Sequence, residues 1–179
     1  MKEYAINLNQ TTNNDGDFVF RFEPTTITVK DVAWSVDTDP ILNHSITYRK
    51  KTGDFLIQNL RLYSDNSELV LKDATFKSAK DFYADGEVRN LDIAKVFALI
   101  KGENDMDLAG IANGKFNIRM DKNNLEPLID LTITDIFMNG SEMGRIEIST
   151  KNSPIPNVFD VDVKVISSGI LGNNNLHLT

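Results

Sequence analysis

Four short stretches in the second half of the chain decide the fold, because apolar and polar side chains alternate in each of them. Residues 116–120 read FNIRM, residues 131–133 read LTI, residues 145–148 read RIEI and residues 161–165 read VDVKV. Successive side chains of a β-strand point to opposite faces of the sheet, so this alternation gives each strand one apolar and one polar face. Such strands are typical of an antiparallel sheet with one solvated side.

The same pattern extends toward the N-terminus, with turn-forming residues between the stretches. Residues 27–29 and 32–36 alternate, and the phase slips by one residue at Lys30 and Asp31, which we interpret as a β-bulge. Asn139-Gly140 is the strongest hairpin signal, because both residues tolerate positive φ. We predict roughly a dozen strands at this spacing of strands and turns.

The sequence therefore predicts an all-β fold, in which an elongated antiparallel sheet curls into a half-barrel groove or packs as a sandwich.

One segment departs from the alternating pattern. Near residues 91–101, apolar side chains at 93, 96, 97 and 100 have helical spacing, and we predict one short helix, lying against the sheet or plugging one end of it. Asn90 is expected to cap its start and Gly102 to end it.

Composition excludes several classes of function. The 179 residues carry a formal net charge of -7, which disfavours binding to the phosphate backbone of nucleic acids. The chain has no cysteine, so disulfides, thiolate zinc sites and cysteine nucleophiles are excluded. Its N-terminus lacks the apolar core of a signal peptide.

Residues with catalytic chemistry are few and isolated. His44 and His177 are the two histidines, neither belongs to a recognisable motif, and both are expected at the surface. The closest carboxylate pairs are Asp15 with Asp17, Asp37 with Asp39, and Asp105 with Asp107. None of them completes a calcium loop, and they are expected to be solvated turn acids. We therefore predict a protein that is not an enzyme and needs no metal or other cofactor.

Three passages resemble a known family. Residues 82–96 (FYADGEVRNLDIAKV), residues 108–118 (LAGIANGKFNI) and residues 139–148 (NGSEMGRIEI) combine regularly placed glycines with alternating strands and one short helix. In these features the chain is similar to the TamB/AsmA-like family of Gram-negative envelope proteins, with residues 1–179 as one β-rich, central or C-terminal-half segment of a larger repetitive protein.

The resemblance implies a long periplasmic sheet folded into a half-open trough, a β-taco, in a protein anchored in the inner membrane outside this segment. Members are implicated in phospholipid movement between membranes and, through an outer-membrane partner, in the assembly or secretion of outer-membrane proteins. Expected partners are thus phospholipid acyl chains and an outer-membrane assembly protein. The end strands of such a segment would expose unpaired backbone and favour pairing between copies.

The alternation also predicts which side chains would line the trough, provided that the strands pair in register. The candidates are Phe116, Ile118, Met120, Leu131, Ile133, Ile146, Ile148, Val161, Val163 and Val165. The same face could instead close on a second sheet as a dry core. In that alternative the chain is a closed β-sandwich, an adhesin or glycan-binding module, with a surface cluster drawn from Trp34, Tyr48, Tyr63 and Tyr83.

Overall fold

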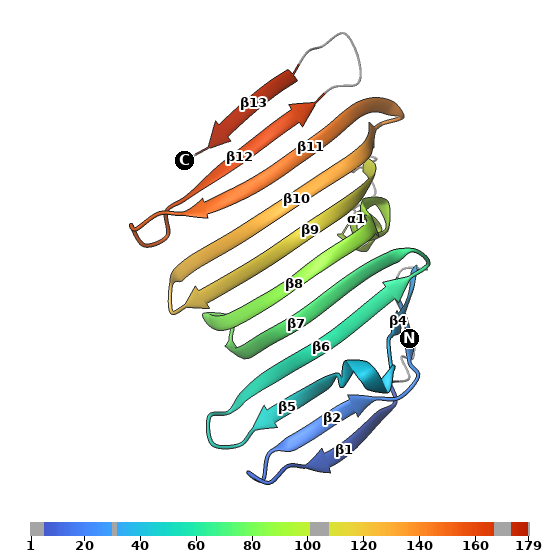
Figure 1. Ribbon diagram of the computed structural model, residues 1–179, viewed down its shortest axis with the longest axis vertical. Coiled ribbons are helices and arrows are strands. Elements are labelled where there is room, and N and C mark those ends of the chain that lie inside the picture. Colours follow the sequence, from blue (N-terminus) through green and yellow to red (C-terminus); the bar gives the residue numbers. More distant parts are fainter. Residues whose placement is uncertain (1–5, 30–31, 101–107, 167–172, 179) are drawn as a thin grey trace.

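A single antiparallel sheet dominates the computed structural model, which describes residues 6–29, 32–100, 108–166 and 173–178. Its strands follow the order β1-β2-β5-β6-β7-β8-β9-β10-β11-β12-β13, while β3 pairs with β4 and β4 pairs with β6 (Figure 1). The elements are β1 (Leu8–Thr12), β2 (Phe18–Phe22), β3 (Thr26–Val29), β4 (Val32–Val36), the 3₁₀ turn η1 (Pro40–Leu42), β5 (Ser45–Arg49), β6 (Asp54–Ser64), β7 (Ser67–Ser78), β8 (Asp81–Asp92), α1 (Ile93–Ile100), β9 (Leu108–Asp121), β10 (Asn124–Met138), β11 (Ser141–Asn152), β12 (Phe159–Ile166) and β13 (Asn173–Leu178).

The predicted all-β class is confirmed, and the sheet is a curled one rather than a sandwich, since the described strands all belong to one sheet. From β5 onward, consecutive strands are antiparallel neighbours in the sheet. Short turns join most of them, whereas α1 lies between β8 and β9. The predicted Asn139-Gly140 hairpin is also confirmed. Met138 pairs with Ser141, and the two turn residues have φ of +49° and +79°.

The interpretation of residues 27–36 as one bulged strand is wrong. Ile27 pairs with Trp34 and Val29 with Val32, so the segment is the β3–β4 hairpin. A two-residue turn puts its flanking residues on the same face, and it therefore slips the alternation by one residue just as a bulge does. Residues 30–31 themselves lie outside the described residues.

The predicted helix exists as α1 and lies against the sheet, but Asn90 does not cap it. The strand β8 continues through Leu91 and Asp92, and the Oδ1 atom of Asp92 accepts a hydrogen bond from the Ala94 N–H at 3.0 Å. Asn90 instead has φ of +46° at a bulge in β8, where its N–H donates to Asn113 Oδ1 at 2.8 Å. Gly102, predicted to end the helix, lies outside the described residues.

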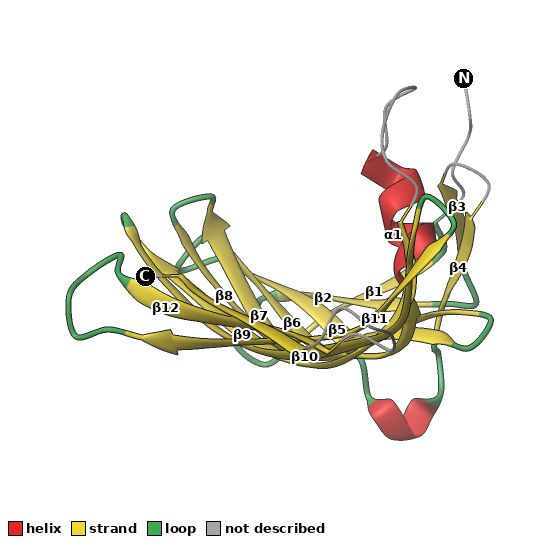
Figure 2. Ribbon diagram, turned by 90° about the horizontal axis from the view of Figure 1, so that it is seen from above, coloured by secondary structure: helices red, strands yellow, loops and turns green. Residues whose placement is uncertain are grey.

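The sheet curves along its strands, so that both strand ends rise on the side that carries α1 (Figure 2). Register shifts occur between Val88 and Leu91 in β8 and between Thr134 and Phe137 in β10, and Asn90 and Asp135 take positive φ there. Bulges of this kind bend strands and increase their twist. The concave side is the floor of a trough that runs across the strands.

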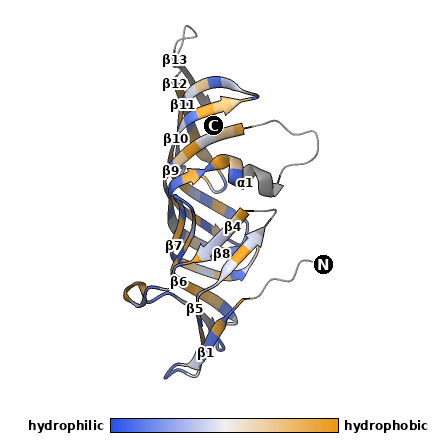
Figure 3. Ribbon diagram, turned by 90° about the vertical axis from the view of Figure 1, so that its right-hand side faces the viewer, coloured by the Kyte–Doolittle hydropathy of each residue, from blue (hydrophilic) through white to orange (hydrophobic). Residues whose placement is uncertain are grey.

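The convex side is polar and carries ion-pair networks, and hydrophilic and hydrophobic residues alternate along the strands (Figure 3). Glu87, which is buried, accepts from Lys72 Nζ at 2.8 Å and also binds Arg89. On the neighbouring strands, Arg61 contacts Glu68 at 2.5 Å and Asp37 at 3.1 Å. Charged pairs thus occupy much of the convex face, which also carries a few apolar side chains such as Leu56, Val70 and Leu128, whereas most apolar side chains of the strands lie on the concave face.

Close packing inside the sheet depends on Gly86. A Cβ atom at this position would lie 2.4 Å from the Val70 carbonyl oxygen and 2.6 Å from Cζ of Phe116. The Phe116 ring thus lies over the glycine, which is its Cα partner on β8. Any larger residue must displace both the ring and a backbone group of β7.

We predict that Gly86→Ala lowers the free energy of unfolding by about 1–3 kcal/mol, because overpacking forces side chains and backbone to shift. The matched control is Gly53→Ala. Gly53 has φ of +72° with no atom within 4 Å of a built Cβ, so its cost is conformational only, about 1 kcal/mol or less. Urea unfolding followed by circular dichroism compares the two, and an equal or smaller loss for Gly86→Ala would contradict this packing.

The convex ion pairs also predict how stability depends on pH. The hydrogen bond from Lys72, with the charge of Arg89, holds the pKa of the Glu87 carboxyl below its ordinary value, and the hydrogen bond from Arg49 does the same for the pKa of Asp54. A carboxyl with a lowered folded-state pKa stabilises the fold above its unfolded-state pKa, about 4, and loses that contribution as the pH falls through the folded-state value.

We therefore expect the free energy of unfolding to decline as the pH falls below about 4, and Glu87→Gln to make that decline shallower while lowering stability at pH 7. Asp121→Asn, at an exposed strand end, is the control and should leave the slope unchanged. Urea titrations at several pH values measure both. A slope in Glu87→Gln as steep as in the parent protein would rule out this role.

Candidate functional site: an open apolar trough

The concave face carries apolar side chains in register across neighbouring strands. Leu131 of β10 pairs with Ile148 of β11, which pairs with Val163 of β12. One step along the strands, Ile133, Ile146 and Val165 form a second row. Cα partners in a sheet share a face, so each row is a continuous apolar line perpendicular to the strands.

All ten side chains predicted to line a trough fall on this one face. Phe116, Ile118 and Met120 of β9 alternate with polar residues on the convex side, and their partners on β10 are Ile129, Pro127 and Leu125. Val161 completes the set opposite Thr150. Each of the ten is half-buried, and among the described residues no second sheet covers them. The structure thus brings the set together on an open surface, and their role toward lipid remains a prediction.

The apolar face extends well beyond these ten residues. Strand pairing carries it from β9 through β8, β7, β6 and β5 to β2, and the additional members are Phe20, Ile46, Ile57, Leu60, Leu62, Leu69, Leu71 and Val88. The sequence pattern did not predict this half of the face, because bulges interrupt the alternation there. At Asn59, with φ of +51°, the alternation of β6 shifts by one residue, so Ile57 and Leu60 share a face although they are three apart.

A row of aromatic side chains follows one long edge of the trough. Phe18, Tyr48, Phe55, Phe76 and Phe82 are successive Cα partners on β2, β5, β6, β7 and β8. The Tyr48 and Phe55 rings lie 5.1 Å apart, and the Phe76 and Phe82 rings stack at 5.9 Å. We call these five residues the aromatic row. Phe55 is 45% exposed and Phe76 is 39% exposed, so the row borders solvent.

Near the opposite edge, α1 covers part of the floor. Ile93 packs with Val88 and Ala112 in the main buried cluster, against Leu69, Leu91, Leu108, Phe116, Leu131 and Ile133. Lys95 fixes the helix across the sheet, since its Nζ atom lies 2.6 Å from Asp65 Oδ2 and 3.3 Å from the Ser64 carbonyl oxygen in the β6–β7 turn. The helix makes the two long edges of the trough unequal.

The expectation that His44 lies at the surface is wrong. Its side chain is buried, and its Nε2 atom accepts a hydrogen bond from the Phe22 N–H at 3.0 Å. His44 immediately precedes β5, and its ring reaches over the end of β2, where it replaces a strand partner for that backbone N–H. His177 pairs through its backbone with Asp162, and its expected surface position stays a prediction.

Three of the paired carboxylates have structural partners, and Asp17 is buried, so the expectation of a solvated turn acid is wrong for it. Asp37 binds Arg61, Asp39 Oδ1 accepts from the Ile41 N–H at 2.9 Å, and Asp17 Oδ1 accepts from the Lys50 N–H at 3.0 Å. Asp105 and Asp107 lie outside the described residues. No group of three or more potential metal ligands occurs in the part of the chain that is described. That the protein is not an enzyme stays a prediction.

The aromatic residues proposed for a glycan site are not gathered in one place. Tyr48 lies on the concave face, whereas Tyr83 lies on the convex face, where Asn117 donates to its hydroxyl at 2.9 Å and Arg119 stacks over its ring. Tyr63 pairs with Glu68, another convex-face residue.

A hollow of about 370 Å³ on the convex face is lined partly by Lys115, which faces away from the trough.

Comparisons with known proteins add no relative. Neither protein-family models, nor curated proteins, nor solved structures match this chain. Within the described residues, none of the helices has the length and apolar character needed to cross a membrane. The function must therefore be argued from the trough itself.

Proposed function

We propose that this chain is a non-catalytic segment of a periplasmic envelope protein, and that its trough carries the acyl chains of phospholipids. One observation carries the proposal. An apolar face continues across the strands from β2 to β12 and is half-exposed outside the part that α1 covers, while the opposite face carries ion pairs. Contiguous exposed apolar surface of this extent is uncommon on soluble monomers and marks a site of interaction with apolar partners.

The size of the trough suits an acyl chain. The longest strands of the floor, such as β9 with 14 residues, extend about 46 Å along their contour. Acyl chains of one bilayer leaflet span about 15 Å, half of the hydrocarbon core. The floor can therefore hold a whole chain, and it offers the same chemistry at every strand along the axis.

The binding energy of an acyl chain in the trough is large enough to hold a lipid and still allows the lipid to slide along the floor. Each buried CH₂ group contributes about 0.8 kcal/mol, so ten methylenes shielded on one side contribute about 4 kcal/mol. Dispersion and hydrophobic burial are not directional, and a lipid can exchange one row of side chains for the next without breaking a specific bond. Such a surface is suited to conducting lipid rather than to trapping it.

The wider assignment rests on the family resemblance of the sequence. We propose that the segment belongs to a larger, repetitive, inner-membrane-anchored protein of the TamB/AsmA-like kind, which works with an outer-membrane partner in lipid transport or protein assembly and secretion. Both ends of the described sheet support a segment of this kind. β1 pairs only with β2, and β13 pairs only with β12, so further strands could extend the trough in either direction.

Paired substitutions on single strands test the trough. Ile118→Asp and Ile148→Asp place a carboxylate on the concave face, and we expect each to reduce co-purifying phospholipid several-fold, because a charge in an acyl-chain site must be desolvated. Asn117→Asp and Ser149→Asp introduce the same group one residue away, on the convex face, and should leave lipid unchanged. Native mass spectrometry and lipid extraction on protein from a bacterial envelope fraction provide the measurement.

Far-UV circular dichroism must show that every variant keeps its β-structure. Lipid-free parent protein, or equal lipid loss in concave and convex variants, would contradict the proposal. If both concave variants unfold, Ile118→Ser and Ile148→Ser offer a milder polar change at the same positions.

A further inference from the structure

The β3–β4 hairpin and α1 together border one long edge of the trough. Figure 2 shows both elements rising from the sheet on the concave side and at the same edge. The hairpin joins the floor through β4, whose Val36 is the Cα partner of Leu62 on β6. Lys95 links α1 to the same place, because its Nζ atom contacts Ser64 and Asp65 at the end of β6. We call β3, β4 and α1 together the wall.

The hairpin turns an apolar face toward the trough. Leu62 belongs to the floor, and Cα partners share a face of a sheet, so Val36 continues the floor onto β4. Trp34 lies two residues before Val36 and is the Cα partner of Ile27, so the same face carries all three side chains. Val36 is buried, whereas Trp34 and Ile27 are half-buried. The wall therefore extends the apolar floor upward, and Trp34 is the largest side chain on this extension.

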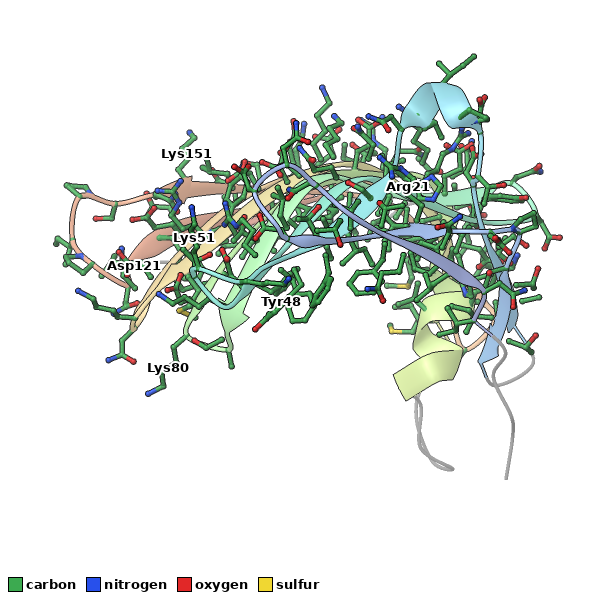
Figure 4. The ribbon with its side chains drawn as sticks, turned by 90° about the horizontal axis from the view of Figure 1, so that it is seen from below. Arg21, Tyr48, Lys51, Lys80, Asp121 and Lys151 are labelled. Atoms are coloured by element: carbon green, nitrogen blue, oxygen red, sulfur yellow. The ribbon has the colours of Figure 1, made fainter. Side chains whose placement is uncertain are left out.

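The opposite edge is bordered by the aromatic row, and in the part of the chain that is described no helix or additional hairpin stands there. Strands β5 to β10 end at this edge in short turns, residues 50–53, 79–80 and 122–123. Tyr48 projects toward the concave side, and Lys51, Lys80 and Asp121 lie at the end of the sheet away from α1 (Figure 4). Charged residues of both signs occur at both edges, so charge does not distinguish the edges, whereas the apolar wall does.

The distance between the aromatic row and the wall suits one phospholipid that lies along the strands. From Phe55 in the row to Leu62 beside the wall, β6 extends about 24 Å. Half of a bilayer measures about 20–22 Å with its headgroups and about 15 Å without them. A lipid whose acyl chains end at the wall therefore has its glycerol and headgroup region over the aromatic row. Amphipathic rings such as Tyr48 are favoured at that depth of a lipid layer.

We propose that the apolar face of the wall, which carries Trp34 and Ile27, is the subsite for the ends of acyl chains. Each phospholipid that passes the wall then lies across the trough in one orientation, with its headgroup at the aromatic row. This inference rests on the proposed function, because it assumes that the trough binds phospholipid. In the reverse orientation a charged headgroup would lose its hydration against Trp34 and Ile27, which is costly. The wall thus sets the orientation of the lipid, and the floor lets the lipid slide along the trough.

The fluorescence of Trp34 tests this orientation, because Trp34 is the only tryptophan of the chain and reports which part of a lipid lies near the wall. The protein is incubated with vesicles of phosphatidylcholine that carries a nitroxide quencher either on the headgroup or near the end of one acyl chain. Gel filtration then separates protein–lipid complexes from vesicles. A phosphorus assay measures the bound lipid, and the tryptophan fluorescence of the same fractions is recorded.

We expect the chain-end label to quench the fluorescence of Trp34 about twofold or more strongly than the headgroup label does, because about 15 Å of acyl chain separates the two labels. The variant Trp34→Phe/Tyr48→Trp moves the tryptophan to the aromatic row. In this variant the order of the two labels should reverse, so that the headgroup label quenches more strongly. The amount of bound lipid should equal that of the parent protein.

A pair of neighbouring substitutions in β3 tests the wall independently. Ile27→Asp places a carboxylate on the face toward the trough and should reduce the bound lipid about threefold or more, because a charge among acyl chains must be desolvated. Thr28→Asp is the matched control. It adds the same group to the exposed outer face of the hairpin and should leave the bound lipid unchanged. Equal lipid loss in the two variants, with far-UV circular dichroism like that of the parent protein, would overturn the role of the wall.

The remaining outcomes separate this inference from the proposed function. If lipid binds and both labels quench Trp34 equally, or the headgroup label quenches it more, the orientation is overturned while the acyl-chain trough stands. If lipid binds and neither label quenches Trp34, the wall is not part of the lipid site, and again only this inference fails. If no lipid co-elutes with the parent protein, both proposals fail.

Discussion

The apolar face of the sheet stays continuous because each register shift returns the alternation to the same side. A one-residue slip in a strand would move every later side chain to the opposite face. In β6 and β8 the bulges at Asn59 and Asn90 occur where the chain would otherwise change faces, and the residues beyond them again point to the concave side. The trough, its exposed floor and the polar convex face all depend on the apolar side chains staying on one side of the sheet.

An exposed apolar floor is costly for a protein that has no ligand. Among the described residues few side chains are buried, and the main buried cluster forms where α1 covers the sheet around Ala112. Elsewhere, backbone pairing and convex ion pairs such as Lys72 with Glu87 hold the strands. A large core is absent from the described residues, and hydrophobic surface that a globular domain would bury inside is left for another molecule. The lipid that we propose as the ligand would cover this surface.

Much of this architecture was predictable from sequence, and the reasons differ from part to part. Within residues 116–120, 131–133, 145–148 and 161–165 the alternation is unbroken, and all ten predicted floor residues lie on one face. The Asn139-Gly140 turn fixes the pairing of β10 with β11. The aromatic row was not predictable. Its five residues are far apart in the chain, and only the bulged registers of β6 and β7 bring Phe55 and Phe76 opposite each other.

The sequence led to a wrong prediction in two places, for different reasons. His44 lies between Asn43 and Ser45, yet it is buried because a backbone N–H of β2 needs an acceptor there. The slip at residues 30–31 has the same signature in a bulge and in a two-residue hairpin, and only the partner strand decides between them. The alternation also could not predict that the apolar face is open, since an alternating strand presents the same residues to a second sheet or to lipid.

Site-specific photocrosslinking tests the central claim most directly, namely that lipid contacts one face along the whole sheet. A photoreactive phenylalanine analogue is placed at Ile57, Ile133 and Val163 on the floor, and at Leu56, Thr132 and Asp162 on the convex face of the same strands. After irradiation of protein in bacterial envelopes, mass spectrometry detects phospholipid adducts. We expect adducts at all three floor positions and none at their convex neighbours. Adducts on both faces, or on neither, would contradict it.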